Sequence, residues 1–260
     1  MTDIDFSFNG VNASAKYFYT ANIIKPLQLS QIQNSIDIPK KSGLYQANKK
    51  FRDNILTIKG VVTGTSPDNL ITNLANISSY LYSDSDKPLI FNNQADRYYN
   101  AQYLDLFEVL RDGNISMVDL RFLCNDPFAY AITPDTDTRT ITVKDTPYTL
   151  ANTGHYYAYP VITITFNDTQ THVYVSNNSI ADNRFDISKA FSSGDVLEVD
   201  CKNGTIKLNG SASYAGFGDG GLGLAEWIRL ATGSNSIVIG TDDSTINVTI
   251  LFTYSKVYLY

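Results

Sequence analysis

The chain has 260 residues, of which 43% are hydrophobic and 18% are charged, with 26 acidic against 20 basic side chains. This apolar fraction is close to the ~45–50% of globular domains, and no window approaches the ~18 consecutive apolar residues of a membrane-spanning helix. Asp3 and Asp5 lie where a secretory signal would carry basic residues, so we expect a soluble, cytosolically made chain without membrane insertion.

The charge is divided unequally along the chain. Residues 1–133 contain 12 bases and 13 acids, whereas residues 134–260 contain 8 bases and 13 acids, a net charge of −5 for the second part. Neither part has the strong positive field that binding to DNA or RNA requires. We therefore expect no specific nucleic-acid binding.

The first part of the chain reads mainly as short strands. Alternating and β-branched runs predict strands at residues 4–8, 55–62, 98–110 and 115–124. The polar stretch at 111–114 contains Asp-Gly between the last two runs, which predicts a β-hairpin.

A single amphipathic helix is predicted at residues 67–82. Ser66 suits the N-cap, and Pro67 suits the first helical position. Apolar residues then follow at helical spacing and form one stripe: Leu70, Ile71, Leu74, Ile77 and Leu81. A membrane or partner helix would show the same stripe, but packing on the protein's own sheet is the simpler interpretation.

The stretch at 133–138 (TPDTDT) predicts a domain boundary because it contains no large apolar residue. We expect a first domain over residues 1–133, a linker at 134–138 and a second domain over 139–260. Further strands are expected at 138–143, 161–166, 171–176, 196–200, 205–208, 236–239 and 246–254. Their spacing of roughly 8–12 residues is typical of a β-sandwich or jelly roll.

The sequence therefore predicts a mainly β fold with two sandwich-like domains, of which the first holds the helix and the hairpin. Gly218, Gly220 and Gly223 match the G-x-G-x-x-G spacing of dinucleotide-binding loops. That motif functions between a strand and a long helix in a parallel sheet. The surrounding pattern is antiparallel, so we interpret this stretch as a loop and expect no cofactor.

Acidic pairs are the remaining candidates for catalysis or metal binding. Two carboxylates could catalyse glycoside hydrolysis or help to bind calcium, but these pairs lie in predicted turns, where Asp is favoured by its backbone hydrogen bonds. They are Asp84 with Asp86, Asp135 with Asp137, and Asp242 with Asp243. We interpret them as solvated turn residues, and we expect no catalytic residue, no metal site and no enzymatic activity.

The cysteines and histidines support the same expectation. Cys124 and Cys201 have no metal-ligand spacing, so free, buried and unreactive thiols are expected. The chain has two histidines, His155 and His172, which are few for imidazole catalysis or for a zinc site.

A basic segment in the first part is a candidate contact site. It contains Lys40, Lys41, Lys49, Lys50 and Arg52, with Tyr45 and Phe51 between them. Basic and aromatic residues together could contact nucleic acid, whereas a solvated hairpin edge protected by lysines would show the same composition. A third interpretation is an arm that docks on an acidic neighbouring subunit.

A possible sugar contact involves Trp227 and Tyr214, together with Phe217 nearby. Aromatic faces can stack on pyranose rings, but the single tryptophan of a β-sandwich is more often part of its core. We expect Trp227 to be mainly a core residue. The acidic second domain is then expected to act as a docking surface for a protein with a basic face.

Three stretches together resemble the distal tail protein (Dit) family of long, flexible-tailed phages. The opening Phe6-Ser-Phe8-Asn9-Gly10-Val11 resembles the family's first strand and turn. Pro88-Leu-Ile-Phe91 followed by Asp96-Arg-Tyr-Tyr-Asn-Ala101 resembles its "PLIF … D-x-x-Y-x-A" segment. Phe122-Leu-Cys-Asn-Asp-Pro-Phe-Ala-Tyr130 resembles the sequence that closes its first domain. More loosely, Asn152-Thr-Gly154 and Pro160-Val-Ile-Thr-Ile164 resemble its galectin-like second domain.

This resemblance implies a homohexameric ring at the virion tail tip that joins the tail tube to the host-adsorption device. It implies that the first domains form the ring and that the second domains project outward. The implied partners are the tail tube protein, a tail-associated tip or lysin protein and a receptor-binding protein. A basic arm that reaches the next subunit would suit the heterologous contacts of such a ring. A carbohydrate-binding adhesin and a tail-associated hydrolase are the alternatives.

Overall fold

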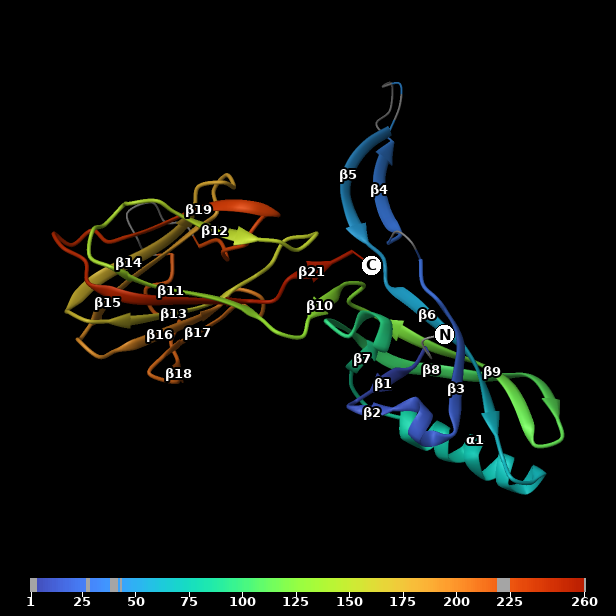
Figure 1. Ribbon diagram of the computed structural model, residues 1–260. Helices are drawn as coiled ribbons and strands as arrows, with labels where there is room; N and C mark the ends of the chain where they lie inside the picture. The colour runs from blue at the N-terminus through green and yellow to red at the C-terminus, as the bar shows by residue number, and fades with distance from the viewer. Residues whose placement is uncertain (1–3, 27–28, 38–41, 43, 219–224, 260) are drawn as a thin grey trace. The chain divides into compact units, whose positions relative to one another are not determined.

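The computed structural model describes residues 4–26, 29–37, 42, 44–218 and 225–259, with the backbone alone for residues 33–37 and 44–49. The chain divides into two compact units, of which the first ends at Ile132 and the second comprises Thr133–Tyr258. Both units consist mainly of antiparallel strands (Figure 1), as the sequence predicted.

Unit 1 is built on an antiparallel sheet with the strand order β2-β1-β7-β8-β9-β6-β3. A further short strand, β10 (Ala129–Ala131), pairs with β8. The strands of the main path are β1 (Phe6–Phe8), β2 (Val11–Asn12), β3 (Phe18–Ile24), β6 (Asn54–Thr63), β7 (Lys87–Phe91), β8 (Arg97–Asp112) and β9 (Ile115–Cys124). Two short 3-10 helices, η1 (Ala13–Lys16) and η2 (Asn92–Gln94), connect them.

The predicted hairpin between β8 and β9 is present, but its turn is tighter than expected. Asp112 pairs with Ile115, so the loop contains only Gly113 and Asn114. Gly113 has a φ of +56°, the sign required at the first central residue of a type II′ turn. The four-residue turn predicted at 111–114 is therefore wrong, because β8 extends to Asp112.

Helix α1 (Pro67–Leu81) begins where the sequence predicted. The hydroxyl of Ser66 accepts a hydrogen bond of 3.1 Å from the amide of Asn69, which confirms Ser66 as the N-cap. The buried stripe differs in one place: Ile71 is exposed, whereas Asn73 is buried and donates to the carbonyl of Thr63 at 2.8 Å. The helix packs against β6 and β9.

No helix within the described ranges has the length and apolar composition needed to cross a membrane.

The core of unit 1 is aromatic. Phe6 contacts Phe18 and Phe122 edge-to-face, with ring centroids 5.7 and 5.9 Å apart. Phe18 lies so close to Gly60 of β6 that a methyl group there would be 2.3 Å from the end of its ring and 2.8 Å from the carbonyl oxygen of Tyr19. Gly60 thus allows β3 and β6 to pack around a buried ring.

Gly60→Ala should destabilise unit 1 by about 1–3 kcal/mol, because the added methyl group overpacks the core. Chemical denaturation of the full chain measures this effect. Lys59→Ala, an exposed change on the same strand, should stay within about 0.5 kcal/mol of the parent protein. Equal stability of the two variants would contradict the packing argument.

A second hairpin stands away from this sheet (Figure 1). It consists of β4 (Gln31–Asp37) and β5 (Leu44–Phe51), which form a separate two-stranded sheet in the described part of the chain. Its base is held in unit 1, since the ring of Phe51 contacts Phe128 at 5.3 Å and the amide of Arg52 donates to Ser30 at 2.8 Å.

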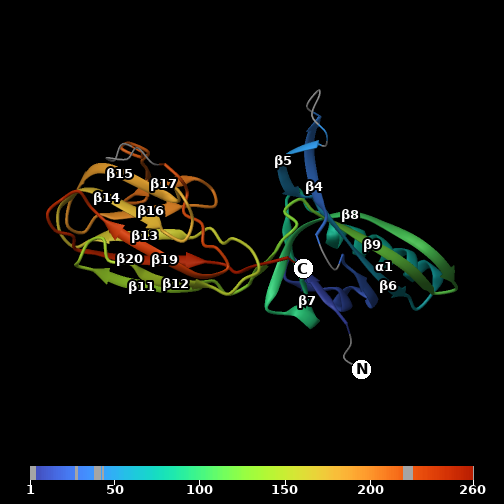
Figure 2. The same cartoon turned by 90° about the horizontal axis from the view of Figure 1, so that it is seen from above.

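Unit 2 is a sandwich of two antiparallel sheets (Figure 2). One sheet has the order β11-β20-β13-β16-β17-β18, and the other has the order β12-β19-β14-β15. Inward positions alternate with half-exposed ones, as in β13 and β20. The sandwich strands are β11 (Asp135–Ile141), β12 (Tyr148–Asn152), β13 (Val161–Phe166), β14 (Gln170–Asn177), β15 (Arg184–Phe191), β16 (Val196–Asp200), β17 (Thr205–Leu208), β18 (Ser211–Ala212), β19 (Gly233–Gly240) and β20 (Val248–Tyr254). A last short strand, β21 (Val257–Tyr258), belongs to neither of these two sheets.

The linker predicted at 134–138 is wrong, because most of it belongs to β11. Asp135 pairs with Tyr254 of β20, and the pairing continues without a break to Ile141. The aspartates that suggested a loop have partners: Asp135 lies 3.3 Å from Lys256, and Asp137 lies 2.8 Å from Arg139. An edge strand with exposed threonines has the same composition as a polar linker.

Candidate functional site

The most unusual surface of unit 1 is the outer end of the β8–β9 hairpin. Large apolar side chains are exposed there, at 63% of the full area for Val109 and 56% for Leu110. We call this set the hairpin surface; it consists of Phe107, Val109, Leu110, Ile115 and Met117. Contiguous apolar side chains of this size on a protein surface mark an interaction site.

The pairing register explains why these side chains face outward together. Ser116 and Val118 of β9 are buried, so Met117 between them faces the opposite side of the sheet. Met117 pairs directly with Leu110 of β8 and with Val61 of β6. An apolar row therefore crosses the sheet on its outer face.

Two irregularities in β8 add to this surface. The register shifts between Tyr103 and Asp105 and again between Glu108 and Leu110, so Leu104 and Val109 are extra residues in bulges. Bulges increase the local twist and redirect side chains, and they are common next to binding sites. Val109 thereby adds an exposed side chain beside Leu110.

Charged residues border the hairpin surface and are already paired. Arg121 donates through Nε to Asp105 at 2.7 Å, and its guanidinium lies 4.6 Å from the ring centre of Phe107. Arg111 donates to Glu108 at 2.6 Å, and this hydrogen bond lowers the pKa of the Glu108 carboxyl. A partner could cover this surface without isolating an unpaired charge.

The predicted basic segment is only partly described. Lys40 and Lys41 lie outside the described residues, and Lys49 is described by its backbone on β5 alone. Lys50 is exposed near the end of β5, and Arg52 lies 3.5 Å from Asp53. Contact of this segment with a neighbouring subunit stays a prediction.

Trp227 is not the core residue that the sequence predicted, because it is only half-buried. Its ring stacks on Phe217 at 4.8 Å with an interplanar angle of 21°, and it lies beside Gly204. Tyr214 is exposed. One face of the indole ring is therefore covered by Phe217. The predicted sugar contact, in which Trp227 and Tyr214 act together, is not supported by this arrangement.

Trp227→Ala should therefore cost about 1–3 kcal/mol, which is less than the ~3–5 kcal/mol of a fully buried aromatic residue. Denaturant unfolding of unit 2 measures this loss. Tyr214→Ala is the matched control, and it should change stability by less than about 0.5 kcal/mol because its side chain is exposed. A loss above ~3 kcal/mol for Trp227→Ala would restore the interpretation as a core residue.

The glycine-rich stretch lies mostly outside the described residues, but its flanks follow the free edge of β15. The amide of Gly218 donates to the carbonyl of Asp186 at 2.8 Å, and Phe217 and Ala225 bridge to Ile187 and Phe185. The described flanks therefore cover part of the edge of β15, and the interpretation of the glycine-rich stretch as a loop stays a prediction.

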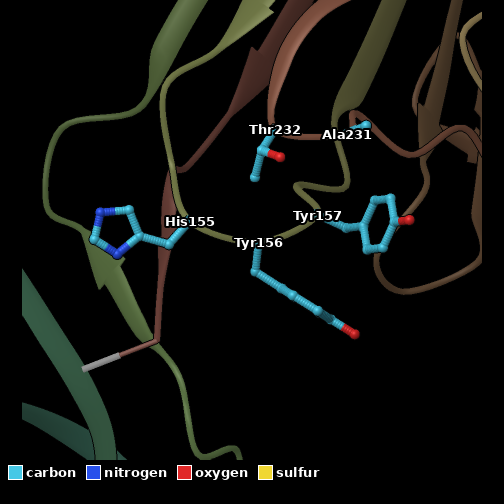
Figure 3. A pocket seen from close by; sticks show the side chains of 5 residues that line it. All are labelled: His155, Tyr156, Tyr157, Ala231 and Thr232. Atoms are coloured by element: carbon cyan, nitrogen blue, oxygen red, sulfur yellow. The ribbon is translucent and has the colours of Figure 1, made fainter. Parts of the chain in front are cut away.

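A cavity of about 150 Å³ in unit 2 was not predicted (Figure 3). It is lined by His155, Tyr156, Tyr157, Ala231 and Thr232. The three ring side chains point in different directions in Figure 3, so they do not form one stacking platform for a sugar. A second cavity of about 350 Å³ lies beside β11 and Tyr148.

Four buried asparagines hold the irregular backbone at 227–231 next to the first cavity. Asn235 accepts from the amide of Ala231 at 2.8 Å and donates to the carbonyl of the same residue at 2.9 Å. Asn183 donates to the carbonyl of Trp227 and accepts from the amide of Arg229. We call this set the asparagine cluster; it consists of Asn152, Asn177, Asn183 and Asn235. The asparagine side chains supply the backbone at 227–231 with hydrogen bonds that a neighbouring strand would otherwise provide.

Three titratable side chains of unit 2, His172, Arg184 and Asp186, lie together. His172 is buried and accepts from the amide of Asp242 at 3.1 Å through Nδ1, while its Nε2 lies 3.3 Å from Asp186. Arg184 binds the same carboxylate at 2.6 Å and stacks over Tyr174. Among the described residues, no group of three or more His, Cys, Asp or Glu side chains could hold a metal ion.

Both cysteines are buried and free, as predicted. Burial raises the pKa of Cys124 and of Cys201 to about 12, so neither is a reactive thiolate at neutral pH.

Comparisons with known proteins agree in both sequence and fold. A family model described as "Siphovirus-type tail component, C-terminal domain" matches residues 153–258. The distal tail protein of Bacillus phage SPP1 is 27% identical over 194 residues, which cover 74% of this chain and 73% of that protein.

The fold is shared with the crystal structure of the SPP1 Dit protein, described as a paradigm of the hub adsorption apparatus in phages that infect Gram-positive bacteria. The TM-score is 0.78 at 20% identity, over 97% of this chain and 98% of that chain. A chain of the phage P2 baseplate has a TM-score of only 0.45 at 8% identity, which is too remote to support an inference. The family match over most of unit 2 and the sequence similarity over most of the chain show that this chain is similar to distal tail proteins of siphovirus-type phages, and the fold is the one seen in the SPP1 Dit protein.

Proposed function

We propose that this protein is a structural subunit of the phage tail tip, where copies form a closed ring that joins the tail tube to the host-adsorption apparatus. The observation that carries the proposal is the 27% identity with the SPP1 distal tail protein over 74% of this chain. The fold shared with the SPP1 hub protein supports the same role. Enzymatic activity forms no part of it.

The ring is proposed to be a homohexamer formed mainly by unit 1. A ring requires heterologous contacts, in which one surface of a subunit meets a different surface of the next. The hairpin surface is suited to one side of such a contact, because it is apolar and its bordering charges are paired. We propose the tail tube protein, a tail-associated tip or lysin protein and a receptor-binding protein as the ring's partners.

The carbohydrate-binding alternative has less support. Phe217 lies against the indole ring of Trp227, and the ring side chains at the 150 Å³ cavity point apart (Figure 3). Unit 2 also has 8 bases against 13 acids, which disfavours anionic wall polymers. A protein partner for unit 2 is the better-supported proposal.

Native mass spectrometry and electron microscopy of the purified full chain test the proposed function. We expect closed rings with the mass of six copies. A protein that stays monomeric at every concentration, and that does not bind purified tail tubes, would contradict the proposal.

A further inference from the structure

Strand β11 lies at the end of its sheet, and within the described ranges it pairs with β20 alone. The pairing runs from Asp135 to Ile141 without a bulge. Such an edge is a template for a further strand, and proteins commonly place charged side chains there to keep other strands away. Strand β11 carries three such side chains, those of Asp135, Asp137 and Arg139, so a further strand fits only if its own charges match them.

The direction of the backbone groups of β11 follows from the neighbouring ladder. The amide of Asn167 donates to the carbonyl of Asn247 at 3.0 Å, so these two residues are a hydrogen-bonded pair. Such pairs alternate with non-bonded pairs along an antiparallel ladder, so Leu251 bonds to Thr163 of β13. Leu251 therefore turns its backbone groups away from Thr138, its register partner on β11.

Every second residue of β11 thus directs both its N–H and its C=O groups to the outer edge of the sheet. These residues are Thr136, Thr138 and Thr140, whose side chains are all exposed. Pro134, the preceding residue in this series, has no N–H group, and β11 ends at Ile141. The edge therefore offers an extended partner the backbone donors and acceptors of three threonines.

A second copy of β11 is the partner whose charges fit this edge. We propose that two copies of unit 2 associate through an antiparallel pair of β11 strands with Thr138 on the two-fold axis. In this register Thr136 faces the partner's Thr140 and Thr138 faces the partner's Thr138, so the outer backbone groups of both edges are bonded. Asp137 then lies opposite the partner's Arg139 on each side of the axis.

The charges specify this register against its neighbours. An axis at residue 137 would place Asp137 opposite the partner's Asp137, and an axis at residue 139 would place Arg139 opposite the partner's Arg139. Like charges directly opposite one another are destabilising, whereas opposite charges and threonine pairs are stabilising. The pair of Asp137 with the partner's Arg139 is of the non-hydrogen-bonded kind, in which the side chains lie closest together.

The ion pairs already present are compatible with this contact. Arg139 donates to Asp137 of the same strand at 2.8 Å, and Asp135 lies 3.3 Å from Lys256. In the strand pair each Asp137 lies beside the guanidinium groups of both copies, so the contact leaves no charge unpaired.

This contact differs in kind from the contacts of a ring. Both copies use the same surface in a two-fold contact, whereas neighbours in a closed ring meet through two different surfaces. The inference therefore goes beyond the proposed function, and it can be tested in protein that does not form rings. A contact through one pair of strands is small, so it is expected to be weak and to require high protein concentrations.

Charge exchange tests the register in full-length protein that also carries Leu110→Asp and Met117→Asp, which should weaken ring formation. Arg139→Asp gives acids on both sides of the axis and Asp137→Arg gives bases there, so each variant alone should dimerise about 10-fold more weakly in sedimentation equilibrium. An equimolar mixture of the two should associate as strongly as the parent, because each acid again faces a base. The double variant Asp137→Arg/Arg139→Asp should also associate as the parent does.

Amide hydrogen exchange locates the contact. We expect the amides of Thr136, Thr138 and Thr140 to exchange at least about 10-fold more slowly in associated than in diluted protein. The amides of Asp137 and Arg139 face β20 and should be protected at both concentrations, which provides an internal control.

Thr138→Pro provides an independent variant, because it removes an N–H group at the outer edge and should leave the sandwich folded. It should abolish association through β11. Thr138→Val keeps the backbone donor and should associate as the parent protein does. Melting of both variants at the parent's temperature verifies their folding.

The outcomes separate this inference from the proposed function. Rings or dimers in which the three threonine amides exchange as fast as in diluted protein would overturn the inference and leave the ring untouched. A mixture of the two charge variants that associates no better than either alone would also overturn it. Protection of β11 that requires added tail tubes would identify another occupant and overturn it as well. Association through β11 in a chain that never forms rings would support the inference and contradict the proposed function.

Discussion

Replacing Leu110 and Met117 together by aspartate should weaken the self-association of the protein by at least about 100-fold relative to the parent protein. Burial of each side chain in an interface would contribute roughly 1.5–3 kcal/mol, and burial of an unpaired carboxylate adds a further cost. Both side chains are about half exposed in the single chain, so unit 1 should remain folded. Sedimentation velocity over a range of concentrations measures the effect.

Ile71→Asp provides the matched control. Ile71 is an apolar residue of α1 with a similar exposure, 52% against 49% for Met117, but it lies outside the hairpin surface. We expect rings to form normally in this variant. Normal assembly of the Leu110/Met117 double variant would exclude the hairpin surface from the subunit contact, and dissociation by Ile71→Asp would extend the contact to the helix.

The second large effect is expected at the asparagine cluster. Asn235→Leu should destabilise unit 2 by roughly 3–5 kcal/mol, because each buried polar group left unsatisfied costs about 1–3 kcal/mol. Asn235 is fully buried and bonds to the backbone of Ala231, Leu150 and Gly233 and to the side chain of Asn177. Leucine can replace the volume but none of these bonds.

Denaturant unfolding followed separately for the two units measures this loss, since a chain with two units need not unfold in one step. Asn178→Leu is the matched control, because Asn178 is exposed and its side-chain oxygen accepts a hydrogen bond from the hydroxyl of Ser176 at the surface. We expect a change below about 0.5 kcal/mol there. A loss of similar size in both variants would contradict a special role for the buried amides.

Local signals explain which elements could be predicted from the sequence. Helix α1 was predicted from its N-cap, its proline and its spacing, all of which act within a few residues. Strands β12 and β15 were missed, and most of the supposed linker is β11. In these strands polar residues occupy buried or paired positions, as Asp186 and Asn152 do, so their pattern does not alternate between apolar and polar.

The candidate site was harder to predict, because burial cannot be read from the sequence. The run at 98–110 predicts a strand, but its pattern does not distinguish buried residues such as Tyr99 from exposed ones such as Val109. The basic segment was visible because charge is a property of composition. The asparagine cluster could not be predicted, because asparagine is common in exposed turns and the sequence does not show which asparagines are buried. Only the tertiary pairing shows which amides are enclosed.

The position of β20 has a consequence for the order in which the protein folds during synthesis. Strand β20 lies between β11 and β13 in the sheet, although it follows them by more than eighty residues in the chain. The sheet therefore cannot be completed until Val248–Tyr254 has been translated, and β11 lacks its partner strand until then. The main sheet path of unit 1 needs nothing beyond Cys124, so a nascent chain can form it first. Long-range pairing of this kind is slow, and unpaired strands are exposed in the meantime. We therefore expect a ribosome-bound chain to depend most on chaperones while unit 2 folds.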